Sequence, residues 1–107
     1  MARKPLYFLA FDSDTVEHLR VIDTKYHSLI RKTIRDQLQF EPETETRNRK
    51  PLKRPTKLGA TWELRFGPNN RFRVLYAVDR ENRKVQILAI GTKENNQLLF
   101  GGKEIEL

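Results

Sequence analysis

The sequence predicts an α+β fold, in which a helical hairpin packs on one face of a mainly antiparallel four-stranded sheet in the order β-α-α-β-β-β. Three observations predict it: a short apolar run near the N-terminus, two stretches with helical periodicity after it, and three stretches with strand alternation in the second half. The chain has 107 residues, and a domain takes roughly 100 to 200. We therefore expect a single domain over residues 1–107.

The first predicted elements are a buried strand over residues 6–11 and a short helix after it. The strand is a run of apolar and aromatic residues between Pro5 and an acidic turn. Asp14 and Glu17 have the spacing of a capping box, which predicts the start of a helix. The buried stripe of this helix is expected to contain Val16, Leu19 and Ile22.

A second and longer helix is expected to begin at Asp23. Its buried face is predicted by apolar residues that recur every four positions, namely Tyr26, Ile30, Ile34 and Leu38, with Leu29 beside them. The residue before a proline avoids the helical region, so the helix ends before Pro42. Residues 41–57 then form a long connection that contains three prolines and has no apolar periodicity.

Three strands are expected after this connection. Residues 60–66 show the clearest alternation, and a turn over residues 67–70 leads into a second alternating stretch. The next strand runs from Val85 to Ile90 and ends at Gly91, and Leu98-Leu-Phe100 with Gly101-Gly102 form a short strand or a turn in the tail. The positions expected to face the core are Ala60, Trp62, Leu64, Phe66, Phe72, Val74, Tyr76 and Val78.

Basic residues concentrate in one part of the chain. The formal charge is +7, and the segment from Arg47 to Arg73 holds nine Lys or Arg and one acid, so it carries 9 − 1 = +8 and the rest 7 − 8 = −1. Alternation directs Glu63, Arg65, Arg71 and Arg73 to the open face of the sheet. We interpret this face as a surface for phosphates, and the alternative is a solvated loop beside charged outer strand positions. The candidate residues for this contact, which become RNA-binding residues under the resemblance described below, are Arg47, Arg49, Lys50, Lys53, Arg54 and Arg71.

Other function classes find little support in the sequence. The absence of cysteine excludes a disulfide framework, a thiolate zinc site and a cysteine nucleophile. His18 and His27 are expected to be ordinary helix residues away from the basic segment, and no metal or cofactor is expected. No stretch approaches the roughly 20 apolar residues of a membrane span. We therefore expect a soluble cytoplasmic protein with no membrane partner.

Several motifs follow one another in a fixed order: Glu45-Thr-Arg-Asn-Arg-Lys-Pro-Leu, Trp62-Glu-Leu-Arg-Phe66, Arg71-Phe-Arg-Val-Leu-Tyr76, Ile87-Leu-Ala-Ile-Gly91 and Phe100-Gly-Gly102. In this order they resemble the RelE/ParE superfamily of toxin–antitoxin systems over nearly the whole chain. The resemblance implies a RelE-like fold and a small toxin that a cognate acidic antitoxin wraps and neutralises in a hetero-oligomer. RelE-like members cut mRNA in the ribosomal A site without a metal and so repress translation, whereas ParE-like members inhibit DNA gyrase.

Residue by residue, the resemblance implies a catalytic group of Glu63, Arg65, Arg73 and Lys93. RelE-like enzymes carry two basic residues at alternate positions of the second strand, and here these positions hold Glu63 and Arg65. The family's arginine early in the third strand matches Arg73, and a further arginine corresponds to Lys93. The position of the expected tyrosine is occupied by Leu99.

These departures leave alternative interpretations of the role of Glu63 and of the function of the protein. As a hypothesis, Glu63 accepts the proton of a 2′-hydroxyl while the cations hold the phosphate; the alternative is a cross-strand ion pair with no chemical role. For the protein, the alternatives are a RelE-like ribosome-dependent mRNA endonuclease, a non-enzymatic ParE-like inhibitor of gyrase, and a non-toxic basic module that binds nucleic acid.

Overall fold

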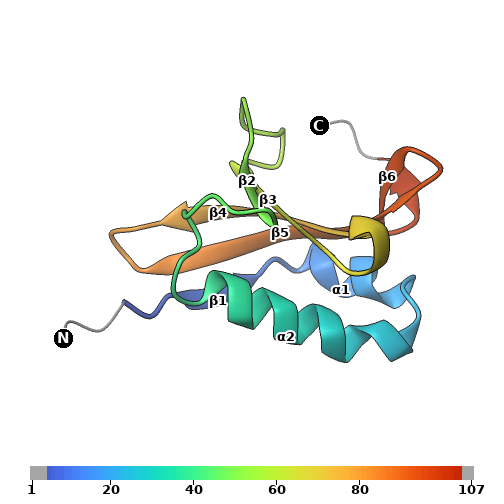
Figure 1. The fold of residues 1–107 in the computed structure, drawn as a ribbon, viewed down its shortest axis with the longest axis horizontal. Helices are drawn as coiled ribbons and strands as arrows, with labels where there is room; N and C mark the ends of the chain where they lie inside the picture. The colour runs from blue at the N-terminus through green and yellow to red at the C-terminus, as the bar shows by residue number, and fades with distance from the viewer. Residues whose placement is uncertain (1–4, 105–107) are drawn as a thin grey trace.

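The computed structural model describes residues 5–104, and its element order confirms the predicted α+β class (Figure 1). The helical half comprises β1 (Phe8–Phe11), α1 (Asp14–Arg20), a 3-10 turn (Thr24–Tyr26) and α2 (His27–Leu38). The sheet half comprises β2 (Arg49–Pro51), β3 (Trp62–Phe66), a 3-10 turn (Pro68–Asn70), β4 (Phe72–Asp79), β5 (Lys84–Glu94), β6 (Gln97–Phe100) and β7 (Lys103–Glu104).

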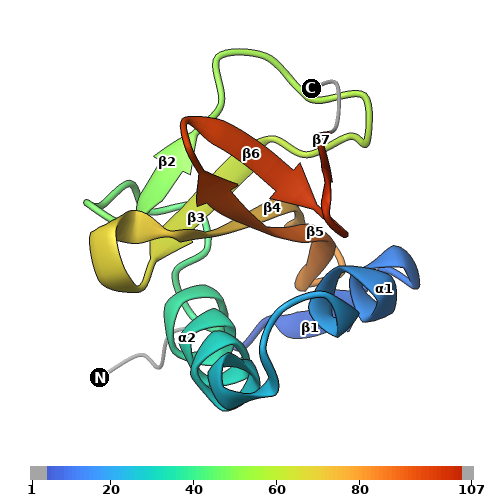
Figure 2. The ribbon, with the colours of Figure 1, turned by 90° about the vertical axis from the view of Figure 1, so that its right-hand side faces the viewer.

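The strands form one seven-stranded sheet in the order β2-β3-β4-β5-β6-β7, with β1 pairing in parallel with β5. Figure 2 shows both helices on the same side of this sheet, as predicted. Of the four expected strands, β3, β4 and β5 form its centre and β1 pairs beside β5, while β2, β6 and β7 extend the sheet. Residues 98–100 were expected to form a short strand or a turn, and they belong to β6. The preceding strand was expected to end at Gly91, whereas β5 continues to Glu94 and turns back through Asn95 and Asn96, both with positive φ.

The first strand is less buried than expected. Phe8 is 71% exposed and Phe11 is 47% exposed. Leu9 packs against the core, whereas Phe8, which points to the opposite face of this edge strand, and Phe11 at its end are left exposed. The prediction of a buried strand is therefore wrong, although the strand itself exists.

The first helix starts without the predicted capping box. The N-cap is Ser13, and the Asp12 side chain, 3.4 Å away, accepts from the backbone N–H of Asp14. The predicted stripe is confirmed at Ile22, which is buried, and at Leu19, which packs against the core, but it is wrong at Val16, which is 58% exposed. The inward positions at the start of the helix are instead occupied by two polar residues, Thr15 and His18.

His18 is buried because it completes the edge of β5. On that edge β1 pairs with residues 84–87 and β6 pairs with residues 91–94, which leaves a gap between them. The backbone N–H of Ile90 lies in this gap and donates to Nδ1 of His18 at 3.2 Å. His18 is thus a structural helix residue, as expected, but it is more buried than expected, because its neutral ring replaces a strand partner.

The second helix confirms its predicted face. Ile30, Ile34 and Leu38 are fully buried, whereas Leu29 is 42% exposed and lies outside the stripe. They pack against the inward residues of β3, β4 and β5, including Leu64, Phe66, Phe72, Val74, Tyr76, Val85, Ile87 and Ile90. Trp62 stacks on Tyr76 with ring centroids 6.2 Å apart, so the aromatic residues of the alternating strands belong to the core, as predicted.

The long connection after α2 is fixed to the core at Tyr76. The Tyr76 hydroxyl donates to the Pro42 carbonyl oxygen at 2.6 Å, and burial raises the pKa of Tyr76, so the hydroxyl remains a donor. Further along, β2 pairs antiparallel with β3. The connection is therefore partly a strand of the sheet.

A second apolar cluster covers part of the other face of the sheet. It is formed by Ala60, Leu75, Leu88, Ala89 and Phe100, with Leu52, Ala77 and Leu98 packed against it. The face expected to be open is thus closed in part by residues 52–60 and by β6. Among residues 5–104, no helix is long and apolar enough to cross a membrane.

Acidification is expected to destabilise the protein through His18. Burial lowers the pKa of His18, against the opposing effect of Asp14 and Asp12. Between the lowered folded pKa and the ordinary value of about 6.5, the unfolded chain binds more protons than the folded one, so stability falls as the pH drops through this window. Urea titrations between pH 8 and pH 5 measure the slope, and His18→Gln should flatten it. An equal slope in the variant would contradict this role.

Gly91 is expected to tolerate no side chain. A Cβ at this position would meet the Leu99 carbonyl oxygen and would lie 2.5 Å from Cδ1 of Phe100. Because the carbonyl belongs to the paired strand β6, it cannot move without breaking the β5–β6 ladder. Gly91→Ala should therefore cost on the order of 1–3 kcal/mol of unfolding free energy, measured by chemical denaturation. A variant as stable as the parent would show that the β6 hairpin is free to shift.

Candidate nucleic-acid interface

Two rows of side chains define the centre of the face that points away from α2. In the first row, Lys50 is in register with Glu63, and Glu63 is in register with Leu75. In the second row, Arg65 is in register with Arg73, which is opposite Gly91. Alternation in β3 and β4 thus places an acid and two arginines on adjacent rows of one face, as the sequence predicts.

Glu63 is the negative centre of this face. It is only 4% exposed, and its Oε1 accepts a hydrogen bond of 2.6 Å from Nε of Arg65. Its Oε2 forms a longer ion pair of 3.6 Å with Nη1 of Arg73. The carboxylate is therefore held between two guanidinium groups, and Oε2 keeps acceptor capacity because the longer contact exceeds a hydrogen bond.

The two arginines differ in their exposure. Arg73 is 7% exposed and is fixed by a hydrogen bond of 2.9 Å from its Nε to the Asn70 carbonyl oxygen. The Arg65 side chain is 40% exposed, with one edge on Glu63. Arg73 thus supplies a fixed positive charge, and Arg65 is the cation that can reach a solvent-borne phosphate.

A hollow of about 310 Å³ adjoins Glu63. Glu63 and Leu75 belong to the sheet, and the other lining residues come from the connection before β3: Leu52, Lys53, Arg54, Pro55 and Thr56. The connection is held by backbone hydrogen bonds from Leu52 to Thr61 and from Thr56 to Ala60. Figure 2 shows this segment above the sheet on the side away from α2. The hollow therefore has an apolar floor, a carboxylate at one side and cations in its wall.

Arg49 does not belong to this face, in contrast to its prediction as an RNA-binding residue. It is opposite Leu64, so it points to the helical side, and it is 7% exposed. Its Nη1 donates to the Gln37 carbonyl oxygen at 2.6 Å, and its Nε donates to that of Thr44 at 2.8 Å. Arg49 therefore joins the end of α2 to the connection, and it is not available to a phosphate.

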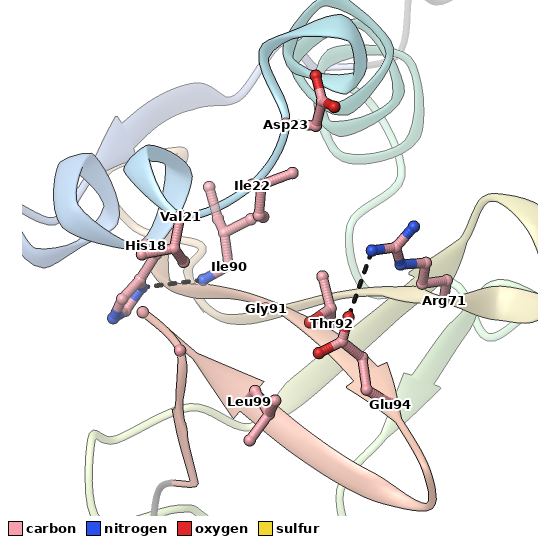
Figure 3. A pocket seen from close by; sticks show the side chains of 12 residues that line it. His18, Val21, Ile22, Asp23, Arg71, Ile90, Gly91, Thr92, Glu94 and Leu99 are labelled. Atoms are coloured by element: carbon pink, nitrogen blue, oxygen red, sulfur yellow. Dashed lines mark hydrogen bonds and ion pairs between the residues drawn. The ribbon is translucent and has the colours of Figure 1, made fainter.

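Arg71 also lies on the helical side, which corrects its predicted direction. Its guanidinium lies 5.5 Å from the Tyr26 ring centroid, and its Nη2 is 3.3 Å from Oε1 of Glu94. It lines a separate pocket of about 100 Å³ together with His18 and Leu99 (Figure 3). Alternation failed here because Arg71 precedes β4 and lies in the turn.

The remaining candidates are exposed or partly exposed. Lys93 is exposed and shares the face of Arg73, because Gly91 is opposite Arg73 and Lys93 follows two residues later. Leu98 is opposite Lys93, whereas Leu99, at the expected tyrosine position, turns to the helical side. Arg47, Lys53 and Arg54 are exposed, and Nζ of Lys50 lies 3.7 Å from Oε2 of Glu45.

The apolar residues of the hollow were missed as site residues. Alternation placed Leu75 on this face, which was a usable signal, but nothing in the connection indicated that Leu52 and Pro55 would fold over it. Within the described residues, no group of three or more His, Asp or Glu side chains could hold a metal ion. What the arrangement offers is a fixed carboxylate, two adjacent guanidiniums and a flanking lysine, which is a set of groups suited to proton acceptance and phosphate binding.

Comparison with known proteins adds the fold family. No family model and no curated protein matches the chain. Among solved structures, the toxin–antitoxin complex RelBE2 from Mycobacterium tuberculosis is similar, with 26% identity and a TM-score of 0.66 over 81% of this chain and 98% of that chain. A free variant of the E. coli toxin RelE, with two arginines changed to alanine, has 19% identity and a TM-score of 0.63 over 83% of this chain and 85% of that chain. The chain therefore has the fold of the RelE-like toxins.

Proposed function

We propose that the chain is the toxin of a type II toxin–antitoxin pair and acts as a metal-independent endoribonuclease on mRNA in the ribosomal A site. The observation that carries the proposal is the buried Glu63 carboxylate between Arg65 and Arg73, beside a basic hollow. The same face in a RelE-like fold supports RNA as the substrate, since Arg65 and Arg73 lie on it and Lys53 and Arg54 line its hollow.

The proposed reaction is an internal transfer at phosphorus. Glu63 accepts the proton of a 2′-hydroxyl, the 2′-oxygen attacks the adjacent phosphorus, and the bond to the 5′-oxygen breaks with a proton from water. Arg65, Arg73 and Lys93 stabilise the charge that develops on the phosphoryl oxygens. The products are a 2′,3′-cyclic phosphate and a free 5′-hydroxyl. This scheme replaces the family's phenol, whose position holds Leu99 on the opposite side of the sheet.

The proposed partner is a cognate acidic antitoxin in the cytoplasm. A groove of about 300 Å³ between β1, α1 and α2 is lined by apolar side chains such as Leu9, Phe11 and Leu19, and by Arg31 and Arg35. Within residues 5–104 neither guanidinium has an ion-pair partner, whereas the neighbouring Lys32 pairs with Asp36. An acidic amphipathic segment complements such a groove, with apolar residues inside and carboxylates on the two arginines.

Cleavage should depend on the acid and on the arginines of the basic face. Glu63→Gln removes the proton acceptor but keeps an oxygen for Arg65, and we expect it to lower cleavage by about 10²–10⁴-fold. Arg65→Ala removes the exposed cation and should lower cleavage by about 10²-fold or more. Primer extension on a message translated in vitro with the purified protein measures both.

Lys32→Ala, on the far side of the sheet, is the matched control and should cut as the parent does, while circular dichroism confirms that each variant is folded. Undiminished cutting in both Glu63→Gln and Arg65→Ala would remove this site. If the message stays intact while replication stops with DNA damage, the protein is instead an inhibitor of gyrase.

Charge reversals in the groove of Arg31 and Arg35 should weaken neutralisation by the antitoxin without changing RNA cleavage. Reversing both charges in Arg31→Glu/Arg35→Glu places two carboxylates against an acidic partner, which should weaken antitoxin binding by 10-fold or more, about 1.4 kcal/mol. Lys32→Glu is the control on the same helix. The measurement is the amount of antitoxin needed to stop cleavage in vitro, and an unchanged amount for the double variant would place the antitoxin elsewhere.

A further inference from the structure

The hollow beside Glu63 and the adjoining row of the sheet together present three chemical zones in a fixed order. The floor of the hollow is apolar, because Leu52 and Leu75 belong to the second apolar cluster. The Glu63 carboxylate borders this floor, since Glu63 is the cross-strand partner of Leu75. The guanidiniums of Arg65 and Arg73 form the next row of the same face.

The sheet places these zones on neighbouring rows. Residues two apart on a strand are separated by roughly 7 Å at the backbone, and the Arg65 side chain reaches back so that its Nε lies 2.6 Å from Oε1 of Glu63. The guanidiniums therefore border the carboxylate directly. A ribonucleotide carries an aromatic base whose flat faces make apolar contacts, a hydroxylated sugar and a phosphate in the same order. The hydroxyls of a ribose are donors, and Oε2 of Glu63 is an acceptor whose ion pair with Arg73, at 3.6 Å, is longer than a hydrogen bond.

We propose that this hollow binds a single ribonucleotide, with the base against Leu52, Pro55 and Leu75, the ribose hydroxyl on Glu63 and the 3′-phosphate on Arg65. The hollow, of about 310 Å³, is at the lower end of the size of small-molecule sites, which suits one base rather than two. The inference deepens the proposed function and rests on it, because it assigns the nucleotide immediately 5′ of the cleaved bond to this hollow.

The residues in the wall of the hollow are consistent with one bound nucleotide that is part of a longer RNA strand. Lys53 and Arg54 are exposed at its rim, so they can contact the phosphates that flank the bound nucleotide. The Thr56 hydroxyl already accepts from the backbone N–H of Ala60 at 3.1 Å, which holds the wall in place. Since the lining has no aromatic ring, the base is held by aliphatic contact and by shape, and all four bases should bind.

The test uses the purified full chain and the four ribonucleoside 3′-monophosphates as probes, with inorganic phosphate for comparison. Calorimetry should show each nucleotide binding at least tenfold more tightly than phosphate. In amide NMR spectra, nucleotides should shift Leu52, Leu75 and Glu63, whereas phosphate should shift the Arg65 and Arg73 row alone. Equal affinity for nucleotide and phosphate, or nucleotide shifts at another surface, would overturn the proposal.

Two leucines of the same connection provide a matched pair of variants. Leu52→Trp fills the hollow and should reduce the preference for nucleotide over phosphate to about one, whereas Leu58→Trp, at a residue that is 39% exposed and outside the lining, should keep it. The two proposals fail separately. If nucleotides bind in the hollow but RNA is not cut, the nucleotide subsite is retained and the endonuclease proposal is rejected. If RNA is cut but Leu52→Trp keeps the preference for nucleotide over phosphate, the endonuclease proposal is retained and the subsite is rejected.

Discussion

The register between β3 and β4 positions both the core and the basic face. Leu64 opposite Val74 and Phe66 opposite Phe72 direct the apolar side chains to the helices, and the same pairing sets Arg65 opposite Arg73 on the other side. A slip by one residue would reverse every side chain of a strand, so burial of the aromatic residues fixes the charged positions as well. The geometry of the candidate site is thus a consequence of packing on the opposite face.

This register places two like charges next to each other, and Glu63 compensates them. Two arginines directly across from each other on a sheet repel, and Arg73 is almost completely buried. The Glu63 carboxylate contacts both guanidiniums and supplies the compensating charge. A structural ion pair and a chemical role are therefore not exclusive here, because the contacts that hold the carboxylate also bring it to the hollow in a fixed orientation. Preorganisation of this kind is what proton transfer in an active site requires.

The sequence was informative where a long alternating strand has one buried face. Trp62 to Phe66 and Phe72 to Val78 are such strands, so Glu63, Arg65 and Arg73 were placed correctly. Arg49 lies in a strand of three residues, too short to show a period, and its side is set by a distant carbonyl at the end of α2. Arg71 lies just before β4, in a turn whose backbone breaks the alternation. His18 was missed because its burial satisfies a backbone N–H in a gap between two other strands, which no local pattern encodes.

The sheet separates the proposed catalytic face from the proposed antitoxin groove, and this separation constrains how neutralisation works. Arg31 and Arg35 lie with α2 on one side, while Glu63 and the hollow lie on the other. An antitoxin confined to the groove would leave the hollow open to RNA. Neutralisation must therefore come either from a segment long enough to pass around the sheet, or from bulk that prevents entry into the ribosome. Such a segment can begin at the edge of β1, because β1 lines the groove and, within residues 5–104, pairs with β5 alone, so that its other edge offers backbone groups for a further strand.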